Sequence, residues 1–205
     1  MKIFLDTANI SAIKMYNDMG LVDGITTNPS LMAKEGGDPK KIMEEIVQII
    51  KGDVSLEVLS METNGMLEEG RRLRKYGNNV VVKCPLTPEG LKACKILTSE
   101  GIPVNVTLCF SVNQAILAAK AGAKYVSPFI GRLDDNGQDG MNLIREMRQV
   151  FQNYKFSTQI LVASIRHPMH VVEAAKIGAD VVTLPPDVLG KMLKHPLTDV
   201  GLKNF

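Results

Sequence analysis

The chain has 205 residues, 45% of them hydrophobic, and its 24 basic and 22 acidic side chains leave a net charge of +2. This length supports a large buried core and fits one large domain or two small ones. The balanced charge, without a basic run or an aromatic-studded basic stripe, argues against nucleic-acid binding. No apolar run approaches the ~18 residues of a membrane span. Asp6 also comes too early for the apolar region of a signal peptide.

Short β-branched runs alternate with stretches of helical periodicity along the whole chain. In chain order, the predicted strands cover residues 2–7, 23–28, 54–59, 80–85, 104–110, 125–131, 159–165 and 180–185. The clearest helical segments cover residues 10–20, 39–52, 87–101, 111–123 and 167–180. Thr87 and Pro88 suit the N-cap and first turn of a helix, and the polar residues 133–140 predict a loop.

Eight strand–helix units without a Pro/Ser-rich linker predict a single α/β domain over residues 1–205. Parallel strands with helical crossovers follow from this alternation, and eight such strands close into a (β/α)8 TIM barrel. The rival fold, an open doubly wound sheet, would need a glycine-rich phosphate loop after the first strand. The first predicted strand instead ends in LDTANI, which contains no glycine. We therefore predict the barrel.

In such a barrel the active site lies where the strands end and the following loops begin. The residues at these strand ends are Asp6, Asn28, Glu57, Lys83, Asn105, Thr107, Ser127, Phe129, Ser164 and Arg166. Side chains two apart on a strand share a face, so Asn105 and Thr107 point the same way. Because the apolar faces would meet the helices, we expect the polar faces to turn into the barrel mouth.

Lys83 directly follows three valines, Val80 to Val82, in the fourth predicted strand. One interpretation is a structural ion pair with Glu57 or Asp6. The other is an amine nucleophile that forms a Schiff base with a ketone or aldehyde. An ordinary lysine, with a pKa of ~10.4, is protonated at pH 7. The nucleophilic role therefore requires desolvation between apolar barrel walls.

Schiff-base chemistry also needs groups that move protons. Asp6 and Glu57 are the candidate acid and base, and Thr107 is a candidate to hold a relaying water. Asp6 alone would also suit a helix N-cap. The combination is more specific than Asp6 alone, because it places two carboxylates, a lysine and a threonine at the ends of separate strands. This pattern favours Schiff-base chemistry.

Arg132 and Arg166 follow the sixth and seventh predicted strands, near the usual phosphate region of a barrel. They are either rim arginines in surface ion pairs or, with Ser164, a phosphate clamp of planar guanidiniums and a hydroxyl. The position of the pair favours the clamp.

The cysteines and histidines do not suggest a metal site. Cys84, Cys94 and Cys109 are odd in number and lack ligand spacing, which predicts buried thiols in a reducing cytoplasm. The spacing of His167 and His170 would suit a weak metal face, but a proline between them marks a helix start. We interpret these histidines as structural and predict no metal.

Seven motifs resemble, in this order, the transaldolase family in its short single-barrel branch, which includes fructose-6-phosphate aldolases. They are FLDTAN, DGITTNPSL, SLEV, VVVKCPLT, NVTLCFS, SPFIGRLDD and VASIRHP, and the resemblance runs from Met1 to about residue 200. The resemblance implies a class I aldolase-type barrel that needs no cofactor. It further implies a Schiff base on Lys83, C–C cleavage by Asp6, and a catalytic water held by Glu57 and Thr107. The implied substrate ligands are Asn28, Asn105 and Ser127 for dihydroxyacetone, and Arg132, Ser164 and Arg166 for phosphate.

Two positions separate the branches of this family. Glu57 and Phe129 resemble transaldolases, whereas the aldolase branch typically has Gln and Tyr there. The C-terminal TDVGLKNF stops where relatives continue with a further helix that packs on a neighbouring subunit. The resemblance still implies a homo-oligomer, a pentamer or decamer.

The leading hypothesis is a cytoplasmic transaldolase of the pentose phosphate pathway. It would move a dihydroxyacetone unit from fructose 6-phosphate or sedoheptulose 7-phosphate to erythrose 4-phosphate or glyceraldehyde 3-phosphate. One alternative is an aldolase that releases free dihydroxyacetone. Another alternative is a non-catalytic barrel that only binds sugar phosphates. The presence of Lys83, Asp6 and Glu57 argues against it, because binding alone does not need these residues.

Overall fold

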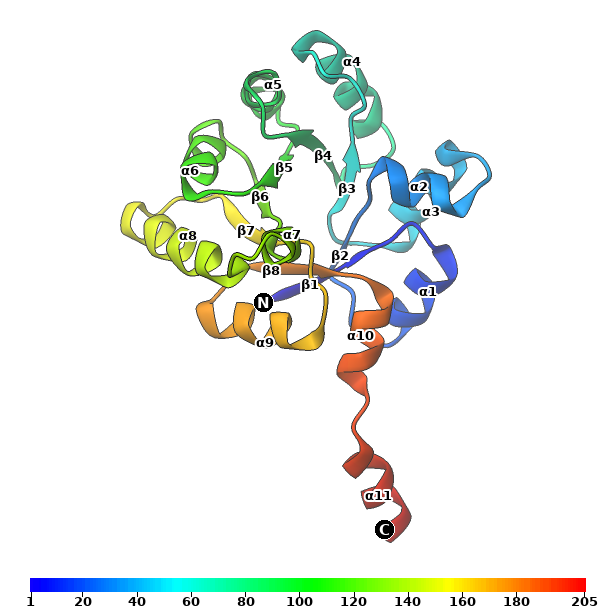
Figure 1. Cartoon of the computed structure of the whole chain (residues 1–205). Helices are drawn as coiled ribbons and strands as arrows, with labels where there is room; N and C mark the ends of the chain where they lie inside the picture. The colour runs from blue at the N-terminus through cyan, green and yellow to red at the C-terminus, as the bar shows by residue number, and fades with distance from the viewer.

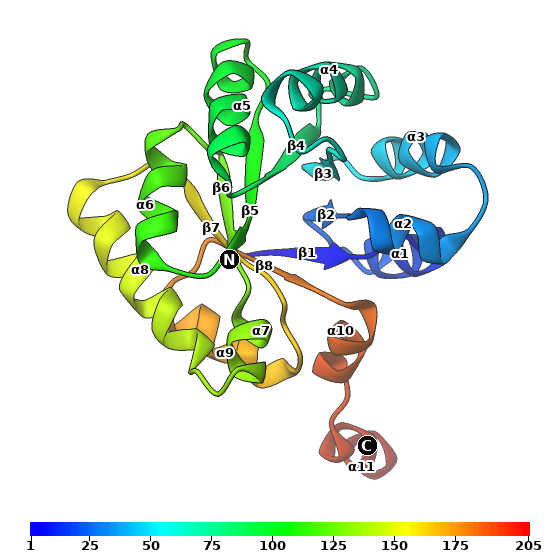
Figure 2. The same ribbon diagram turned by 45° about the horizontal axis from the view of Figure 1, so that its top comes forward.

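The computed structural model describes residues 1–205 and contains eight parallel strands that close into a barrel in chain order. Figure 2 shows the helices arranged around the strands. The strands are β1 (Lys2–Asp6), β2 (Gly24–Thr26), β3 (Val54–Glu57), β4 (Val80–Pro85), β5 (Val104–Cys109), β6 (Tyr125–Pro128), β7 (Gln159–Val162) and β8 (Val181–Leu184). The predicted (β/α)8 fold is confirmed.

The helices outnumber the strands because two of the connections contain two helices each and two more helices follow β8. They are α1 (Ile10–Asp18), α2 (Pro29–Glu35), α3 (Pro39–Ile49), α4 (Thr63–Arg74), α5 (Pro88–Ser99), α6 (Val112–Lys120), α7 (Ile130–Asp135), α8 (Gly140–Tyr154), α9 (Pro168–Ile177), α10 (Pro186–Leu193) and α11 (Pro196–Asn204). The predicted cap of α5 is confirmed, since Thr87 Oγ1 accepts a hydrogen bond from Gly90 N at 3.0 Å. Pro88 at the first turn fits there because its missing N–H has no helical partner.

The strands bury both faces, one against the helices and the other inside the barrel. Outward residues such as Leu56, Val82 and Val106 belong to the large core that the helices cover. A separate cluster of apolar side chains lies on the alternate parity: Phe4, Val81, Tyr125, Leu161 and Val181. We name this cluster the interior layer. The predicted polar residues from Asp6 to Ser127 have this inward parity, so they also turn inward, nearer the carboxyl ends of the strands. Ser164 and Arg166 do not: they have the parity of the outward Ile160 and Val162, and they lie beyond the end of β7.

Seven of the eight predicted strands run past the carboxyl end of the observed strand, and the largest excess is three residues, at β6 and at β7. β6 stops at Pro128 and β7 at Val162, although Phe129 and Ala163 still form an isolated bridge. The chain leaves the sheet because α7 begins at Ile130 and because Ser164 adopts a left-handed conformation with φ 60°. The loop predicted for residues 133–140 was also partly wrong, since α7 extends to Asp135.

The C-terminal segment TDVGLKNF lies in α11, which stands apart from the barrel in both views (Figure 1 and Figure 2). None of its residues is buried, and Leu197, Val200 and Leu202 are exposed. None of the helices combines the length and apolarity that crossing a bilayer requires.

Candidate active site

Lys83 lies inside the barrel, on β4, and only 6% of it is exposed to solvent. Its neighbours in the sheet are Glu57 on β3 and Asn105 on β5. The Lys83 Nζ atom donates a hydrogen bond to the Thr27 carbonyl oxygen at 3.2 Å. No ion pair in the structure includes this lysine, which contradicts the interpretation of a structural ion pair with Glu57 or Asp6. A buried amine without a paired carboxylate is the environment that a Schiff-base nucleophile requires.

Asp6 ends β1 and is held by a threonine rather than by a helix. Its Oδ1 atom accepts a hydrogen bond of 2.8 Å from Thr26 Oγ1, and the Thr26 hydroxyl also contacts the Thr183 hydroxyl on β8. The N-cap of α1 is Asn9, whose side chain accepts from Ala12 N at 2.9 Å. The alternative of Asp6 as a helix cap is therefore wrong.

Both carboxyl groups near Lys83 hold their protons more tightly than usual. Burial raises the pKa of Asp6, and the positive charge of Lys83 and the Thr26 hydrogen bond only partly oppose this effect. Burial likewise raises the pKa of Glu57; Lys83 opposes this, while Asp6 adds to it. Carboxyl groups with raised pKa values are better proton acceptors near neutral pH than ordinary ones. The positions of Asp6 and Glu57 near Lys83, and their raised pKa values, are those expected of general acid–base catalysts.

A chain of polar side chains crosses the interior from β6 to β3. Ser127 Oγ donates to Asn105 Oδ1 at 2.7 Å, and Asn105 Nδ2 donates to Ser55 Oγ at 3.2 Å. Thr107, two residues beyond Asn105 on the same strand, is buried, and its Oγ1 atom has no protein partner. A buried hydroxyl without a hydrogen bond costs about 1–3 kcal/mol. This oxygen is therefore available to a water or a substrate hydroxyl.

Asn28 lies at the same end of the barrel but has a structural task as well. It is the N-cap of α2, and its Oδ1 atom accepts from Leu31 N at 2.9 Å. The carboxamide oxygen thus already accepts one hydrogen bond from the helix, whereas the NH2 group has no protein partner.

Phe129 and Arg132 lie together where β6 passes into α7. The Arg132 guanidinium lies 5.2 Å from the centroid of the Phe129 ring, a cation–π distance. The ring also packs against Phe110, with centroids 5.7 Å apart. Arg132 is exposed and makes no ion pair, so its guanidinium is free for an anion.

Ser164 and Arg166 lie on the loop after β7, directly against the start of α7. Gly131 N donates to the Ser164 carbonyl at 2.9 Å, and a Cβ atom on Gly131 would collide with both Ser164 and Arg166. The Arg166 side chain therefore runs beside the residue that precedes Arg132. Its Nη2 atom donates to Asp135 Oδ2 at 2.8 Å, so in this structure Arg166 does form the rim ion pair of the alternative interpretation.

Two strained residues mark this end of the barrel. Ser164 (φ 60°) and Leu108 (φ 63°), which follows Thr107, both adopt the left-handed conformation that non-glycine residues avoid. Backbone strain of this kind costs on the order of 1–3 kcal/mol and clusters at functional sites.

The sequence pattern missed several residues that complete the site. Thr26 and Thr183 support Asp6, yet no polar residue on the eighth strand was singled out. Parity offered a signal for Thr26, because it lies two residues before Asn28. Asp134 and His170 also contact each other, at 3.0 Å, beside Arg166. The sequence alone predicts only a structural role for His170, because the proline before it marks a helix start.

The cysteines are buried, as predicted, and form no disulfide. Burial raises the pKa of Cys84 to about 12, of Cys94 to about 11 and of Cys109 to about 12. Thiols with such pKa values remain protonated and unreactive at neutral pH. No group of three His, Cys, Asp or Glu side chains has the geometry of a metal site.

Comparison with known proteins shows the family to which the chain belongs. The model of the Transaldolase/Fructose-6-phosphate aldolase family matches residues 3–204. The chain belongs to this family. Among relatives named "Probable transaldolase", that of Nitrosopumilus maritimus (strain SCM1) is 75% identical, covering 100% of this chain and 93% of its own. Those of Methanococcus maripaludis (strain C7) and Aquifex aeolicus (strain VF5) are 60% and 58% identical, and each covers 100% of this chain. The match covers 95% of the Methanococcus chain and 94% of the Aquifex chain.

Solved structures of lower identity share the barrel. A mandelate oxidase mutant with a monooxide FMN adduct superimposes with a TM-score of 0.60 at 16% identity. That match covers 90% of this chain but only 64% of the oxidase chain. At this identity the likeness shows the fold alone.

Proposed function

We propose that this member of the transaldolase family is a transaldolase that works through a Schiff base on Lys83. It would transfer a dihydroxyacetone unit from a ketose phosphate, fructose 6-phosphate or sedoheptulose 7-phosphate, to an aldose phosphate. The acceptor would be erythrose 4-phosphate or glyceraldehyde 3-phosphate. The observation that carries the proposal is Lys83 itself, a buried lysine with one carbonyl partner and no ion pair.

The proposed reaction begins when the neutral Lys83 amine adds to the ketose C2 carbonyl. The carbinolamine loses water to form the imine, and a water held by Glu57 and Thr107 would carry the protons of this step. The unpartnered Thr107 hydroxyl and the raised pKa of Glu57, caused by burial, support this assignment.

Asp6 would then accept the proton of the C4 hydroxyl as the C3–C4 bond breaks. The electrons of that bond enter the enamine on Lys83, and the aldose phosphate leaves. An acceptor aldehyde reverses these steps: the enamine carbon attacks the carbonyl carbon, and Asp6 returns the proton to the new alkoxide. The raised pKa of Asp6, due to its burial, supports both directions of this transfer.

Borohydride trapping tests the proposal. Reduction in the presence of fructose 6-phosphate should fix a dihydroxyacetone-derived adduct on the peptide that contains Lys83, as read by mass spectrometry. Lys83→Met should abolish the adduct and keep the fold, whereas Lys92→Met is the matched control, because Lys92 is an exposed lysine paired with Glu89. An adduct on Lys92 or Lys95, or none at all, would refute the mechanism.

Transfer is preferred to aldol release because the Phe129 ring has no hydroxyl to supply a proton to the enamine. With fructose 6-phosphate alone, we expect little free dihydroxyacetone, and turnover once erythrose 4-phosphate is added. Phe129→Tyr should raise the release without acceptor. If the unmodified protein releases dihydroxyacetone as fast alone as it transfers with acceptor, it is an aldolase.

A further inference from the structure

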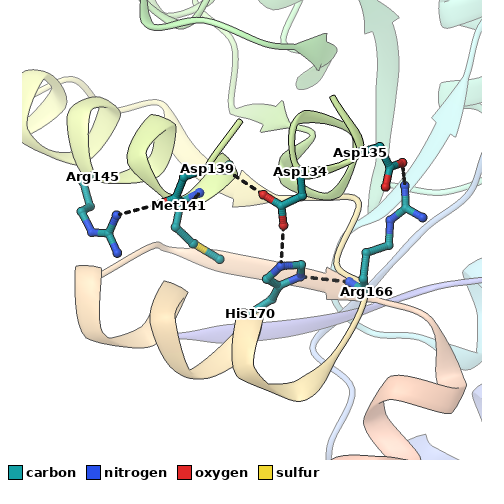
Figure 3. A network of polar contacts seen from close by, with 8 residues as sticks. Asp134, Asp135, Asp139, Met141, Arg145, Arg166 and His170 are labelled. Carbon is teal, nitrogen blue, oxygen red and sulfur yellow. Dashed lines mark hydrogen bonds and ion pairs between the residues drawn. The ribbon is translucent and has the colours of Figure 1, made fainter. Parts of the chain in front are cut away.

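A buried histidine holds the main chain of Arg166 in place. The backbone N–H of Arg166 donates to His170 Nδ1 at 3.1 Å, and His170 Nε2 contacts Asp134 Oδ2 at 3.0 Å (Figure 3). The second oxygen of Asp134 accepts from Gly140 N at 2.8 Å, at the start of α8. We name this set the Asp134–His170 relay. The His170 side chain is only 6% exposed.

The hydrogen bonds of the relay require one tautomer of His170. A backbone N–H can only donate, so Nδ1 must be unprotonated, and the single ring proton must lie on Nε2. From there it donates to the Asp134 carboxylate. Burial, and next the neighbouring His167, lower the pKa of His170 despite the opposing charge of Asp134. The neutral ring that the relay needs is therefore the form that burial favours.

The relay joins the two segments that bear the candidate phosphate ligands, α7 with Arg132 and the loop after β7 with Ser164 and Arg166. Ile130 N donates to the Ala163 carbonyl at 3.1 Å, and Gly131 N donates to Ser164 at 2.9 Å. These bonds tie the start of α7 to the loop after β7, but they end before Arg166. The relay adds a third tie from Asp134 in α7, through His170 in α9, to the Arg166 main chain. Without it, nothing in the structure bonds the Arg166 N–H.

We propose that His170 and Asp134 are positioning residues that hold Arg166 beside Arg132, so that both guanidiniums meet the phosphate of one sugar substrate. Asp134 does this by fixing the tautomer in which His170 accepts from Arg166. This rests on the proposed function, because it takes Arg166 as a phosphate ligand. Neither residue touches the substrate.

Two substitutions of His170 separate the two ends of the relay. Asn places an oxygen where Nδ1 lies, so His170→Asn keeps an acceptor for Arg166 and loses the contact with Asp134. Gln places an NH2 group near Nε2, so His170→Gln keeps that contact and leaves Arg166 N–H without an acceptor. We expect His170→Gln to raise KM for glyceraldehyde 3-phosphate about 3- to 10-fold, the loss of one hydrogen bond. His170→Asn should change it less than 2-fold, and neither should change kcat with unphosphorylated glyceraldehyde.

Asp134→Asn tests the tautomer. Its oxygen can still accept from Gly140, which turns an NH2 group toward His170 Nε2 and forces the ring proton to Nδ1, against the Arg166 N–H. We expect the same rise in KM as for His170→Gln. In a His170→Asn background the Asp134 substitution should add nothing, because no tautomer remains to be set.

His167→Asn is the matched control, since its ring packs 3.8 Å from that of His170 but makes no hydrogen bond to Arg166. Equal effects of His170→Gln and His170→Asn, or equal losses with phosphorylated and unphosphorylated acceptors, would overturn the inference. Borohydride trapping of unphosphorylated dihydroxyacetone on Lys83 keeps the two proposals apart. Its failure in the unmodified protein refutes the Schiff base, whereas normal trapping with unchanged phosphate selectivity in His170→Gln refutes only the relay.

Discussion

The proposed phosphate site requires Arg166 to exchange partners when a sugar phosphate binds. In this structure its guanidinium contacts Asp135 at 2.8 Å, with 49% of the Arg166 side chain and 61% of the Asp135 side chain exposed. An ion pair so exposed contributes about 0.2–1 kcal/mol. A charge-assisted hydrogen bond to a phosphate contributes about 1.5–3 kcal/mol. A phosphate therefore displaces Asp135 from the Arg166 guanidinium. The net free energy of phosphate binding is reduced by the free energy of the ion pair that is lost.

These magnitudes predict opposite effects at the two residues. Arg166→Ala should raise KM for glyceraldehyde 3-phosphate about 10- to 100-fold, because the phosphate contact is lost. Asp135→Asn should lower the same KM about 1.4- to 5-fold, because the guanidinium no longer leaves an ion pair.

Steady-state kinetics with glyceraldehyde 3-phosphate and with unphosphorylated glyceraldehyde measure both effects. Only the phosphorylated acceptor should respond, and the response to Asp135→Asn should shrink at high salt, where exposed charges are screened. If Arg166→Ala raises KM equally for both acceptors, Arg166 has a structural role and is not a phosphate ligand. If Asp135→Asn raises KM instead, the carboxylate orients the guanidinium and does not compete for it.

Three further outcomes follow from the buried groups. Asp6→Asn should abolish transfer but raise the free energy of unfolding in urea at pH 7. Burial raises the folded-state pKa of Asp6, so the ionised group opposes folding as the pH rises through that pKa; a variant no more stable than the parent would contradict this. Cys84, Cys94 and Cys109 should resist a thiol reagent in the native state and react within minutes in guanidinium, since burial keeps them protonated; fast native labelling would show that they are accessible. Gly131→Ala should cost about 1–3 kcal/mol of stability and weaken phosphate binding, because its Cβ collides with Ser164 and Arg166; unchanged KM for glyceraldehyde 3-phosphate would refute that contact.

Strand number and side-chain parity were readable from the sequence because they depend on local periodicity. Val81 and Lys83 share a face whatever the rest of the chain does, and the structure places both inside the barrel. The ends of β6 and β7 were less predictable, because tertiary bonds decide them. Residues 129–131 have the composition of a strand, yet Gly131 N bonds to Ser164 and turns the chain into α7.

The partners of the site residues could not be read from the sequence, because they come from distant segments. Thr26 and Thr183, which meet beside Asp6, are 157 residues apart. Asp134 and His170 are 36 residues apart and meet only because the fold brings the end of α7 close to the start of α9. Periodicity says which way a side chain points, whereas such pairs depend on how the barrel closes.

The interior of the barrel explains how one set of strands supplies both a core and a reactive site. Phe4, Val81, Tyr125 and Val181 of the interior layer each precede a polar residue of the mouth by two positions: Asp6, Lys83, Ser127 and Thr183. Alternation thus places an apolar layer directly below a polar one. In this arrangement Phe4 lies beneath Asp6, and burial inside the barrel raises the pKa of Asp6 and of Glu57. The stabilising packing of the barrel and the basicity of its carboxyl groups therefore have the same physical cause.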